Sequence, residues 1–439
     1  MRKLSLQQNW RVGLFGLVAL LCAGLLTLET LRIAGAEAPA TLRTSPQIAR
    51  AATLWPDNPD LQYEIGNLRL YSSERPDAAE GMRELHRATE LSPLRAGLWR
   101  GLAWACESDA DAACADRAVE RVRALAPMTP RAVWFVANYY LRSERNEMAL
   151  AQFGHLLQLS PSYDQYVLRA CDSAELSNAL LEKLFTGAGP QVELTYISHL
   201  AARGDVASAN QLWRDLAASA IQHNFSISMD WVEPYLDVLL NRGLGGPARE
   251  VWSDLQKLGV IHAHPDSKEN YVFNGDFEEP TSDSGLDWRL PDVAYATVDL
   301  VQDRPQHGQR CMRVDFGEGH NDTYLLAYEL VPVDPNSHYL LTAQVRSEGI
   351  TSDSGPYLQV FDPSCLACLN VQTTSTVGTT PWHQIQLRFS TGPQTHLARL
   401  QLARAASNNF PMEITGVFWL DNVMLKSEGS TRSEPISVN

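Results

Sequence analysis

The sequence predicts a multidomain chain in which an α-helical array is followed by an antiparallel β-sandwich. Three observations support this prediction. Prolines recur at a constant interval in the first part of the chain, the apolar residues between them follow helical spacing, and at Tyr271 the pattern changes to short alternating segments. With 439 residues, the chain is also longer than one ordinary domain.

Prolines define the repeating unit of the helical part. Pro59, Pro93, Pro127 and Pro161 follow one another at equal spacing. A proline cannot continue a helix, because its ring clashes with the preceding turn and it has no N–H to donate. We therefore expect each of these prolines to separate the end of one helix from the start of the next unit.

Small and larger apolar residues recur at equivalent positions of successive units. They are Ile65, Leu68, Gly81, Leu85 and Ala88 in the unit 62–95, Trp99, Leu102, Ala103, Ala115, Val119 and Val122 in the unit 96–129, and Val133, Val136, Ala137, Tyr140, Ala149, Phe153 and Leu156 in the unit 130–163. This pattern, at the spacing set by the prolines, resembles a tetratricopeptide array, whose period is about 34 residues. The resemblance implies stacked helix pairs whose concave face binds extended peptides or partner helices. A role as a spacer and packing support is equally open from the sequence.

Helix pairs are expected to continue beyond the fourth proline, although the strict period ends there. Gln211–Leu216 and Glu250–Leu255 are similar in sequence, and each contains a tryptophan at its third position, Trp213 and Trp252. We interpret these segments as parts of two further, longer helical hairpins that end near Leu258.

The N-terminus has features of both a signal peptide and a membrane anchor. Three basic residues precede an uncharged apolar run, Val12–Leu28, and small residues follow at Ala34–Ala38. A run of this length is just sufficient to span a bilayer. Because Glu29–Ile33 separates the run from the small residues, the pattern favours an uncleaved inner-membrane anchor within residues 1–38. Basic residues before the run keep the N-terminus in the cytoplasm, so we expect the rest of the chain in the periplasm or outside the cell.

Composition argues against nucleic acid as a partner. The chain has 51 Asp and Glu against 36 Lys and Arg, a net charge of −15, whereas binding to phosphates needs clustered basic residues. The sequence also lacks a phosphate-binding glycine loop, a His-Glu-x-x-His motif and a Gly-x-Ser-x-Gly motif. We therefore expect a non-enzymatic protein, although a glycosidase-type pair of carboxylates has no fixed spacing and stays open.

The cysteines are too sparse for a disulfide framework. Cys106 and Cys114 flank an expected helix–helix turn and can form a disulfide in an oxidising compartment. For Cys365 and Cys368, a loop disulfide or two free thiols is favoured over a metal or redox site, because neither a second ligand pair nor a thioredoxin-like context is present.

Short strands are expected from Tyr271 onward. The segments are Gln309–Phe316, Tyr324–Val331, Tyr339–Ser347, Tyr357–Phe361, His383–Ser390, Ala398–Ala403 and Val417–Lys426. Regular short strands separated by Gly, Pro, Asn, Asp and Ser are typical of an antiparallel sandwich. The expected division is a helical domain over residues 39–260, a linker over 261–270, the sandwich over 271–427 and a disordered tail over 428–439.

The order of several short sequence segments in this second part resembles that in the carbohydrate-binding modules of families four, nine and twenty-two. These segments are Asn274–Glu278, Trp288, Tyr339–Val345, Pro381–Phe389 and Phe418–Val423. The resemblance implies a galactose-binding-like jelly roll. It also implies a structural calcium ion held by Asp276, Glu278 and Asp421 with backbone carbonyls. The alternative is that these carboxylates cap turns by accepting backbone N–H groups.

Aromatic residues at alternating positions are the candidates for sugar binding, because sugar C–H groups stack on aromatic rings. Period-two alternation places Tyr324 and Tyr328 on one face of their strand, and Tyr357, Gln359 and Phe361 on one face of another. Burial in the core is the commoner fate of aromatic residues in sandwiches and is the alternative for either set.

We expect an envelope-anchored scaffold that binds a partner protein through its helical repeats and a glycan through its sandwich. The combination of modules favours a role in assembly or export of bacterial exopolysaccharide. Two alternatives are a scaffold that binds only proteins and a glycan-active enzyme with an unrecognised site.

Overall fold

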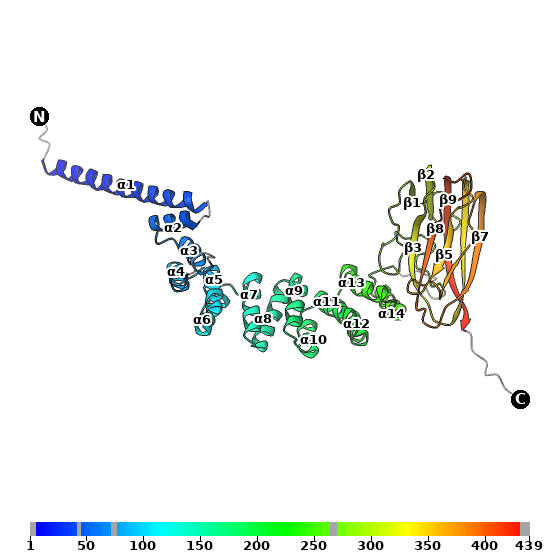
Figure 1. The fold of residues 1–439 in the computed structure, drawn as a ribbon, viewed down its shortest axis with the longest axis horizontal. Coiled ribbons are helices and arrows are strands. Elements are labelled where there is room, and N and C mark those ends of the chain that lie inside the picture. Colours follow the sequence, from blue (N-terminus) through cyan, green and yellow to red (C-terminus); the bar gives the residue numbers. More distant parts are fainter. Residues whose placement is uncertain (1–5, 42–44, 72–76, 263–269, 431–439) are drawn as a thin grey trace. The chain divides into compact units, whose positions relative to one another are not determined.

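The computed structural model describes residues 6–41, 45–71, 77–262 and 270–430 (Figure 1). The chain divides into two compact units, Met1–Ala188 and Gly189–Asn439, and each is described by itself. The second unit contains both the last four helices and the whole sandwich. Most of the linker expected at 261–270 and the end of the expected tail lie outside the described residues.

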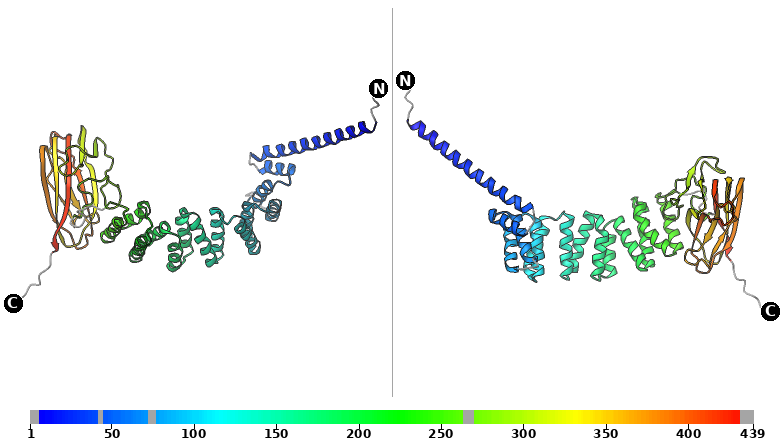
Figure 2. Two further views of the ribbon diagram at one scale, coloured as in Figure 1. Left: turned by 180° about the vertical axis from the view of Figure 1, so that it is seen from behind. Right: turned by 45° about the horizontal axis from the view of Figure 1, so that its top comes forward.

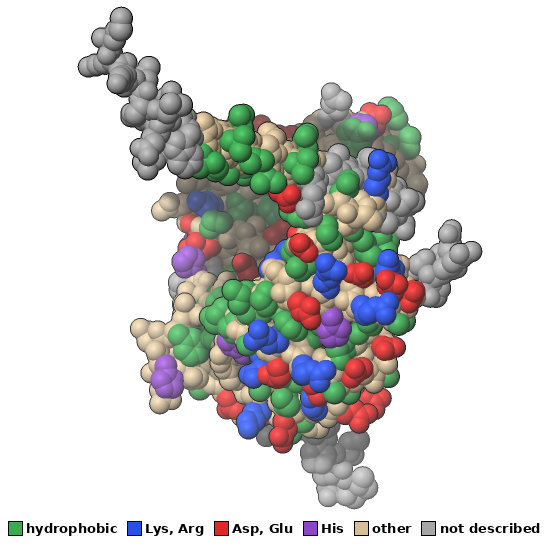
Figure 3. Space-filling view, turned by 90° about the vertical axis from the view of Figure 1, so that its left-hand side faces the viewer, with side chains coloured by type: hydrophobic (Ala, Val, Ile, Leu, Met, Phe, Trp, Pro, Cys, Tyr) green, Lys and Arg blue, Asp and Glu red, His purple; other side chains and the backbone are tan. Residues whose placement is uncertain are grey.

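The first unit is entirely helical in its described part. Its elements are α1 (Leu6–Thr41), α2 (Ser45–Leu54), α3 (Pro59–Tyr71), α4 (Ala78–Leu91), α5 (Ala96–Ser108), α6 (Ala112–Leu125), α7 (Pro130–Arg142), α8 (Asn146–Leu159), the 3₁₀ turn η1 (Pro161–Tyr163), α9 (Asp164–Ser173) and α10 (Asn178–Thr186). In α1, Gly13–Leu31 is long and apolar enough to cross a membrane, and none of it is buried inside the protein. Figure 3 shows hydrophobic side chains along this helix.

The expected helix pairs are present as α3–α4, α5–α6 and α7–α8 (Figure 1). Close crossing of α3 and α4 depends on two glycines. A Cβ atom on Gly66 would lie 2.8 Å from Leu85, and one on Gly81 would lie 2.9 Å from the carbonyl of Gly66. Asp77 and Asp111 begin α4 and α6 by accepting backbone N–H groups of the first turn.

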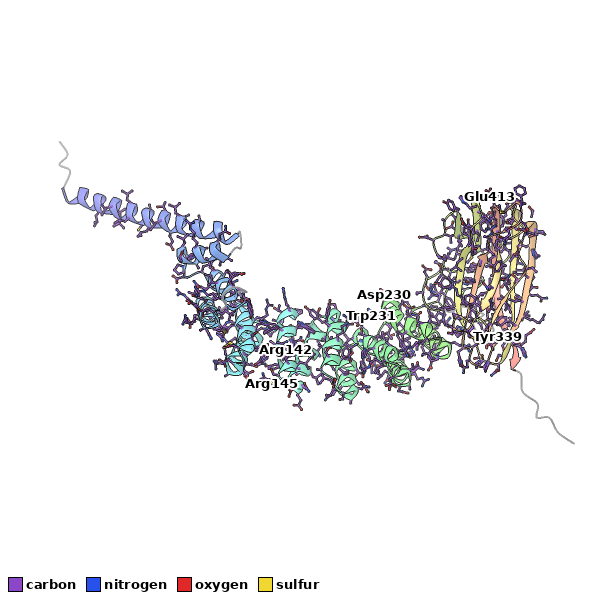
Figure 4. The ribbon with its side chains drawn as sticks, in the orientation of Figure 1. Arg142, Arg145, Asp230, Trp231, Tyr339 and Glu413 are labelled. Atoms are coloured by element: carbon purple, nitrogen blue, oxygen red, sulfur yellow. A yellow bond between two sulfur atoms is a disulfide. The ribbon has the colours of Figure 1, made fainter. Side chains whose placement is uncertain are left out.

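Polar contacts connect successive hairpins of the first unit. Arg142 of α7 forms an ion pair with Glu107 of α5 at 2.7 Å, and Arg145 pairs with Asp116 of α6 at 2.6 Å (Figure 4). The hydroxyl of Tyr139 also donates to Asp116, at 2.7 Å. On the face in Figure 3, acidic and basic side chains are interspersed without a block of either sign. That face therefore shows no cluster of basic side chains of the kind that binds nucleic-acid phosphates.

The second unit begins with two helical hairpins, as the sequence predicts. They are α11 (Pro190–Arg203) with α12 (Val206–His223), and α13 (Met229–Asn241) with α14 (Gly245–Lys257). Trp213 and Trp252 occupy equivalent buried positions in α12 and α14. The short pair α9–α10 precedes them, and its irregular length explains why the sequence period ends at Pro161.

The sandwich consists of two antiparallel sheets (Figure 2). Its strands are β1 (Ala296–Val301), β2 (Cys311–His320), β3 (Tyr324–Pro332), β4 (Ser337–Ile350), β5 (Tyr357–Phe361), β6 (Asn370–Gln372), β7 (Gly378–Ser390), β8 (Leu397–Arg404) and β9 (Ile414–Ser430). One sheet has the order β1-β2-β9-β4-β7 and the other the order β3-β8-β5-β6. All seven expected strands are present, whereas β1 and β6 were not anticipated. Strand β9 extends through Ser430, into the segment expected to be a tail.

Aromatic rings fill the space between the two sheets. Trp288, Phe277, Phe316, Tyr339 and Phe418 are among the largest fully buried side chains. Phe277 and Trp288 pack with ring centroids 5.4 Å apart, and both come from the segment before β1. The opening phrase of the sandwich therefore has a structural role in the core.

The structure contains two disulfides among the described residues. Cys106 and Cys114 connect α5 to α6, and Cys365 and Cys368 close the loop between β5 and β6. Both agree with the favoured interpretation of the sequence.

Helix α14 packs directly on one end of the sandwich. The ring of Trp252 contacts Phe273 edge-to-face, with centroids 5.2 Å apart. The guanidinium of Arg249 donates to the carbonyl of Pro332 at 2.7 Å and lies 4.9 Å from the ring centroid of Tyr271. Gly245 permits this contact, because a Cβ atom there would overlap the backbone carbonyl of His396.

Substituting Gly245 tests whether this contact stabilises the second unit. We expect Gly245→Val to lower the free energy of unfolding by about 1–3 kcal/mol, because the added side chain meets backbone that cannot move aside. The matched control is Gly246→Val, since a Cβ atom on Gly246 has nothing within 4 Å. Thermal unfolding of both variants measures the difference, and equal melting temperatures would contradict the prediction.

Candidate functional site

The outer face of the four-stranded sheet carries a compact set of side chains that are polar or aromatic except for one leucine. Pairing of β3 with β8 and of β8 with β5 places these side chains in two adjacent rows. The first row is Tyr328, Gln401, Gln359 and Gln372, and the second row is Leu330, Arg399, Phe361 and Asn370. We call these eight residues the outer-face rows. Their strand neighbours Leu400, Leu402, Leu358 and Val360 point inward and are buried.

An arginine lies between two aromatic rings in these rows. The guanidinium carbon of Arg399 is 3.9 Å from the ring centroid of Tyr328 and 5.8 Å from that of Phe361. Arg289, which bridges to β3 opposite Tyr328, has its guanidinium carbon 5.6 Å from the same ring. Burial lowers the pKa of Arg399, and the positive charge of Arg289 lowers it further. The guanidinium remains charged, because the ordinary pKa of arginine is above 12.

Side-chain amides form a hydrogen-bonded chain beside the rings. Gln401 donates through Nε2 to Oε1 of Gln359 at 2.7 Å, and Gln359 donates through Nε2 to Oδ1 of Asn370 at 2.8 Å. These bonds hold three planar amides in fixed orientations across β8, β5 and β6. Planar amides can donate and accept hydrogen bonds with the hydroxyl groups of a ligand.

Four of the five residues predicted to bind carbohydrate lie together on this outer face. Tyr328, Tyr357, Gln359 and Phe361 are all half-buried there. Tyr324 is different, because it is only 4% exposed and packs in the core. The expectation that it shares a face with Tyr328 is wrong. Pairing shifts between Leu325 and Ala327, and such a bulge turns the residues before it to the other face.

Sequence reasoning missed four polar members of the outer-face rows, Arg399, Gln401, Asn370 and Gln372, and also the neighbouring Arg289. Arg399 and Gln401 alternate with buried leucines in β8, so the period-two pattern of that strand could have indicated them. Arg289 lies in a loop that pairs with β3 through one isolated bridge, and no local pattern signals that pairing.

Two of the three carboxylates predicted to bind calcium hold a loop. Asp421 accepts the backbone N–H groups of Gln306 at 2.8 Å and His307 at 3.0 Å. Glu278 accepts those of Gln309 at 2.7 Å and Arg310 at 3.0 Å.

These contacts correspond to the turn-capping alternative, in which the carboxylates accept backbone N–H groups. The third predicted ligand, Asp276, lies in the same opening phrase as Glu278, and its Oδ1 atom is buried. Among the described residues, no group of three or more His, Cys, Asp or Glu is arranged to hold a metal ion. Calcium binding by Asp276, Glu278 and Asp421 stays a prediction.

A second candidate surface lies on the first helices of three successive hairpins. A depression of about 190 Å³ is lined by Tyr63, Asn67, Arg100, Gly101, Trp104 and Phe135, which belong to α3, α5 and α7. Trp104 is 50% exposed there. Gly101 leaves room for the ring of Tyr63, which a Cβ atom at that position would overlap.

Comparison with known proteins gives matches to solved structures only. No protein-family model and no curated protein sequence matches the chain. A structure described as "Crystal structure of MamA protein" matches the helical part with 14% identity, covering 37% of this chain and 90% of that chain with a TM-score of 0.30. "CBM4 structure and function" matches the β part with 11% identity, covering 36% of this chain and 99% of that chain with a TM-score of 0.27.

A third match is a bacteriophage CBA120 tailspike protein 4 described as an enzymatically active domain. The identity is 15%, the match covers 36% of this chain and only 21% of that chain, and the TM-score is 0.27. The helical part and the β part of this chain each have matches among solved structures. At these identities the likeness concerns fold alone.

A buried carboxyl group lies directly behind the outer-face rows. Glu329, between Tyr328 and Leu330 in β3, points inward and is 0% exposed. Its Oε1 accepts the backbone N–H of Phe273 at 2.8 Å. Burial raises the pKa of Glu329 well above its ordinary value, and the nearby charge of Asp287 raises it further. The folded protein therefore favours the protonated form of this carboxyl more than the unfolded chain does.

This buried group predicts a defined pH dependence. Unfolded Glu329 loses its proton near its ordinary pKa of 4.5, whereas folded Glu329 keeps its proton to a higher pH. The free energy of unfolding therefore falls as pH rises above that value, by up to ~1.4 kcal/mol per pH unit. We expect Glu329→Gln to raise the melting temperature at pH 8 more than at pH 5. Glu413→Gln is the matched control, because it removes one carboxyl at an exposed position (Figure 4). An equal effect of Glu329→Gln at both pH values would contradict the prediction.

Proposed function

We propose that this chain is a non-catalytic, membrane-anchored scaffold that binds a glycan on the outer-face rows and a protein partner along its helical repeats. One observation carries the glycan half of the proposal. Two aromatic rings, a stacked guanidinium and three linked amides share one face of a four-stranded sheet. Aromatic rings receive sugar C–H groups, while amide and guanidinium groups receive hydroxyls.

The composition of this face favours binding over hydrolysis. None of the outer-face rows is Asp or Glu, whereas glycoside hydrolysis needs a pair of carboxylates on either side of the scissile bond. The amide chain and the stacked arginine instead offer several neutral donors and acceptors and one cation. A glycan-active enzyme therefore has less support than a binding module, and it remains the alternative if reducing ends are released.

The apolar N-terminal helix supports a location outside the cytoplasm. Gly13–Leu31 can serve as an anchor or as a signal sequence, and both deliver the following residues out of the cytoplasm. The two disulfides fit an oxidising compartment. A glycan-binding sandwich in that compartment supports a role in assembly or export of a bacterial exopolysaccharide.

The helical depression supports the partner-binding half of the proposal. Its lining combines the exposed ring of Trp104 with Tyr63, Phe135 and the cation of Arg100. Aromatic residues and arginine are enriched where protein interfaces gain most of their binding energy. A face made by α3, α5 and α7 would accommodate an extended segment that crosses several hairpins.

Loss of one ring tests glycan binding. We expect Tyr328→Ala or Phe361→Ala to weaken retention on a bound polysaccharide about tenfold, because a stacking contact of ~1.4 kcal/mol corresponds to that factor. Phe410→Ala is the matched control, since Phe410 is 94% exposed and lies in a loop outside this face. Affinity electrophoresis against a polysaccharide panel gives the measurement. Equal retention of all variants would favour a scaffold that binds only proteins.

Photo-crosslinking tests the partner surface in membranes. We expect a photoreactive phenylalanine derivative at Trp104 to form a discrete adduct with another polypeptide, because that side chain lines the proposed docking surface. The same substitution at Met128, which is 68% exposed in the turn between α6 and α7, is the control. Identical adduct patterns at both positions would show that the surface around Trp104 has no preferred partner.

A further inference from the structure

Arginines on the two sheets of the sandwich have different partners. On the five-stranded sheet, arginines pair with carboxylates: Arg313 with Asp315 at 2.6 Å, Arg346 with Glu348 at 3.5 Å, and Arg388 with Glu428 at 3.2 Å. Within the described part of the chain, neither Arg399 nor Arg289 forms an ion pair with an acidic side chain. Arg289 donates instead to the backbone carbonyl of Gly285 at 3.0 Å. The outer face of the four-stranded sheet therefore carries uncompensated positive charge.

The environment of Arg399 makes this charge unusual. Its guanidinium stacks on Tyr328, and its Nε atom is buried without a hydrogen-bond partner among the described residues. Burying an unpaired polar group is unfavourable, and it is more so for a charged group. The second cation, Arg289, is near the same ring and repels the first. An anion bound at the edge of the guanidinium would compensate this charge and reduce the repulsion between the two guanidinium groups.

Geometry selects the kind of anion. A guanidinium stacked flat on a ring keeps its edge available, and that edge presents N–H donors in a rigid fork. A carboxylate matches this fork with two oxygens, in a charge-assisted bidentate pair. The amides of Gln359 and Gln401 lie beside it in the adjacent row and are suited to hydroxyl groups. The arrangement therefore fits a sugar that carries both a carboxylate and hydroxyls.

We propose that the glycan bound by the outer-face rows is acidic, with a sugar carboxylate paired to Arg399 and the charge of Arg289 supporting it. This inference rests on the proposed glycan-binding function and names the substrate class of the same site. Arg399 determines specificity, while the rings of Tyr328 and Phe361 supply stacking that a neutral sugar would share.

The net negative charge of the chain repels an acidic polymer, so binding must depend on the local positive charge of Arg399 and Arg289. The net charge of −15 repels an acidic polymer at long range. That repulsion is screened beyond ~8 Å at physiological salt, whereas a partly buried pair is screened much less. We expect binding to persist at physiological salt for this reason, with Arg399 providing the contact that overcomes the general repulsion.

The experiment compares acidic polymers with their methyl esters, which differ from them only in carboxyl charge, and with neutral and sulfated polymers. Full-length chain in detergent micelles is tested for retention on polygalacturonate, alginate and hyaluronate, on the methyl-esterified form of each, and on the neutral polymers galactan, xylan and mixed-linkage glucan. We expect retention by at least one acidic polymer, weakened at least tenfold by methyl esterification. Sulfated dextran separates carboxylate preference from general attraction to polyanions, and should be retained no more than the methyl esters.

Substitutions in the site separate specificity from stability. Arg399→Gln should weaken binding to the acidic polymer at least tenfold, and Arg399→Lys should restore part of it. The control is Arg388→Gln, which removes the same charge from the other sheet, where Arg388 already pairs with Glu428. Because Arg399 forms no ion pair within the described residues, Arg399→Gln should leave the melting temperature unchanged or raise it. A purely structural role would lower the melting temperature and weaken retention on neutral and acidic polymers alike.

The outcomes distinguish the preference for acidic glycans from glycan binding in general. Equal retention on neutral and acidic polymers, unaffected by Arg399→Gln, would overturn the acidic preference and leave the glycan-binding function standing. Equal loss of binding in Arg388→Gln would also overturn it, because net charge alone would then explain the effect. Absence of retention on every polymer would overturn both the proposed function and this inference.

Discussion

The candidate site depends on the register of β8 between β3 and β5. That register places Gln401 beside Tyr328 and Gln359, and Arg399 beside Phe361. Because side chains alternate with a period of two, a slip of one residue would turn every outward side chain of β8 into the core. The buried leucines Leu400 and Leu402 prevent that slip, since their exposure would cost more free energy than any outer-face contact returns. Core packing therefore maintains the arrangement of the candidate site.

Two arginines of strand β8 differ in how their guanidinium groups are hydrogen-bonded. Arg404 is 0% exposed, and it donates to acceptors from several loops, among them the carbonyls of Ser354 and Met412. All three nitrogen atoms of that guanidinium donate hydrogen bonds, and they connect several loops of the sandwich. Arg399, earlier in the same strand, has a buried Nε without a partner among the described residues. The two arginines lie on opposite faces of β8 and have opposite hydrogen-bond environments, because side chains alternate along the strand.

Helix α14 packs against the sandwich and so connects it to the helical hairpins of the second unit. Its contact uses a glycine against a backbone carbonyl, an edge-to-face pair of Trp252 with Phe273, and the donor groups of Arg249. Phe273 also donates its backbone N–H to Glu329, which lies behind the outer-face rows. The segment around Phe273 therefore connects α14 to the strand that carries the candidate site. Contacts between helices and strands both contribute to the stability of the second unit.

The sequence by itself determined the two classes of structure, since proline spacing and helical periodicity define the hairpins and period-two alternation defines most strands. It also indicated Tyr328, Tyr357, Gln359 and Phe361, because alternation within a regular strand is a local property. Tertiary structure alone decided that Tyr324 is in the core, because a bulge reverses faces without changing composition. It also decided the approach of Arg289 and Arg399 to one ring. That approach depends on pairing between segments distant in sequence, and no local pattern encodes which strands become neighbours.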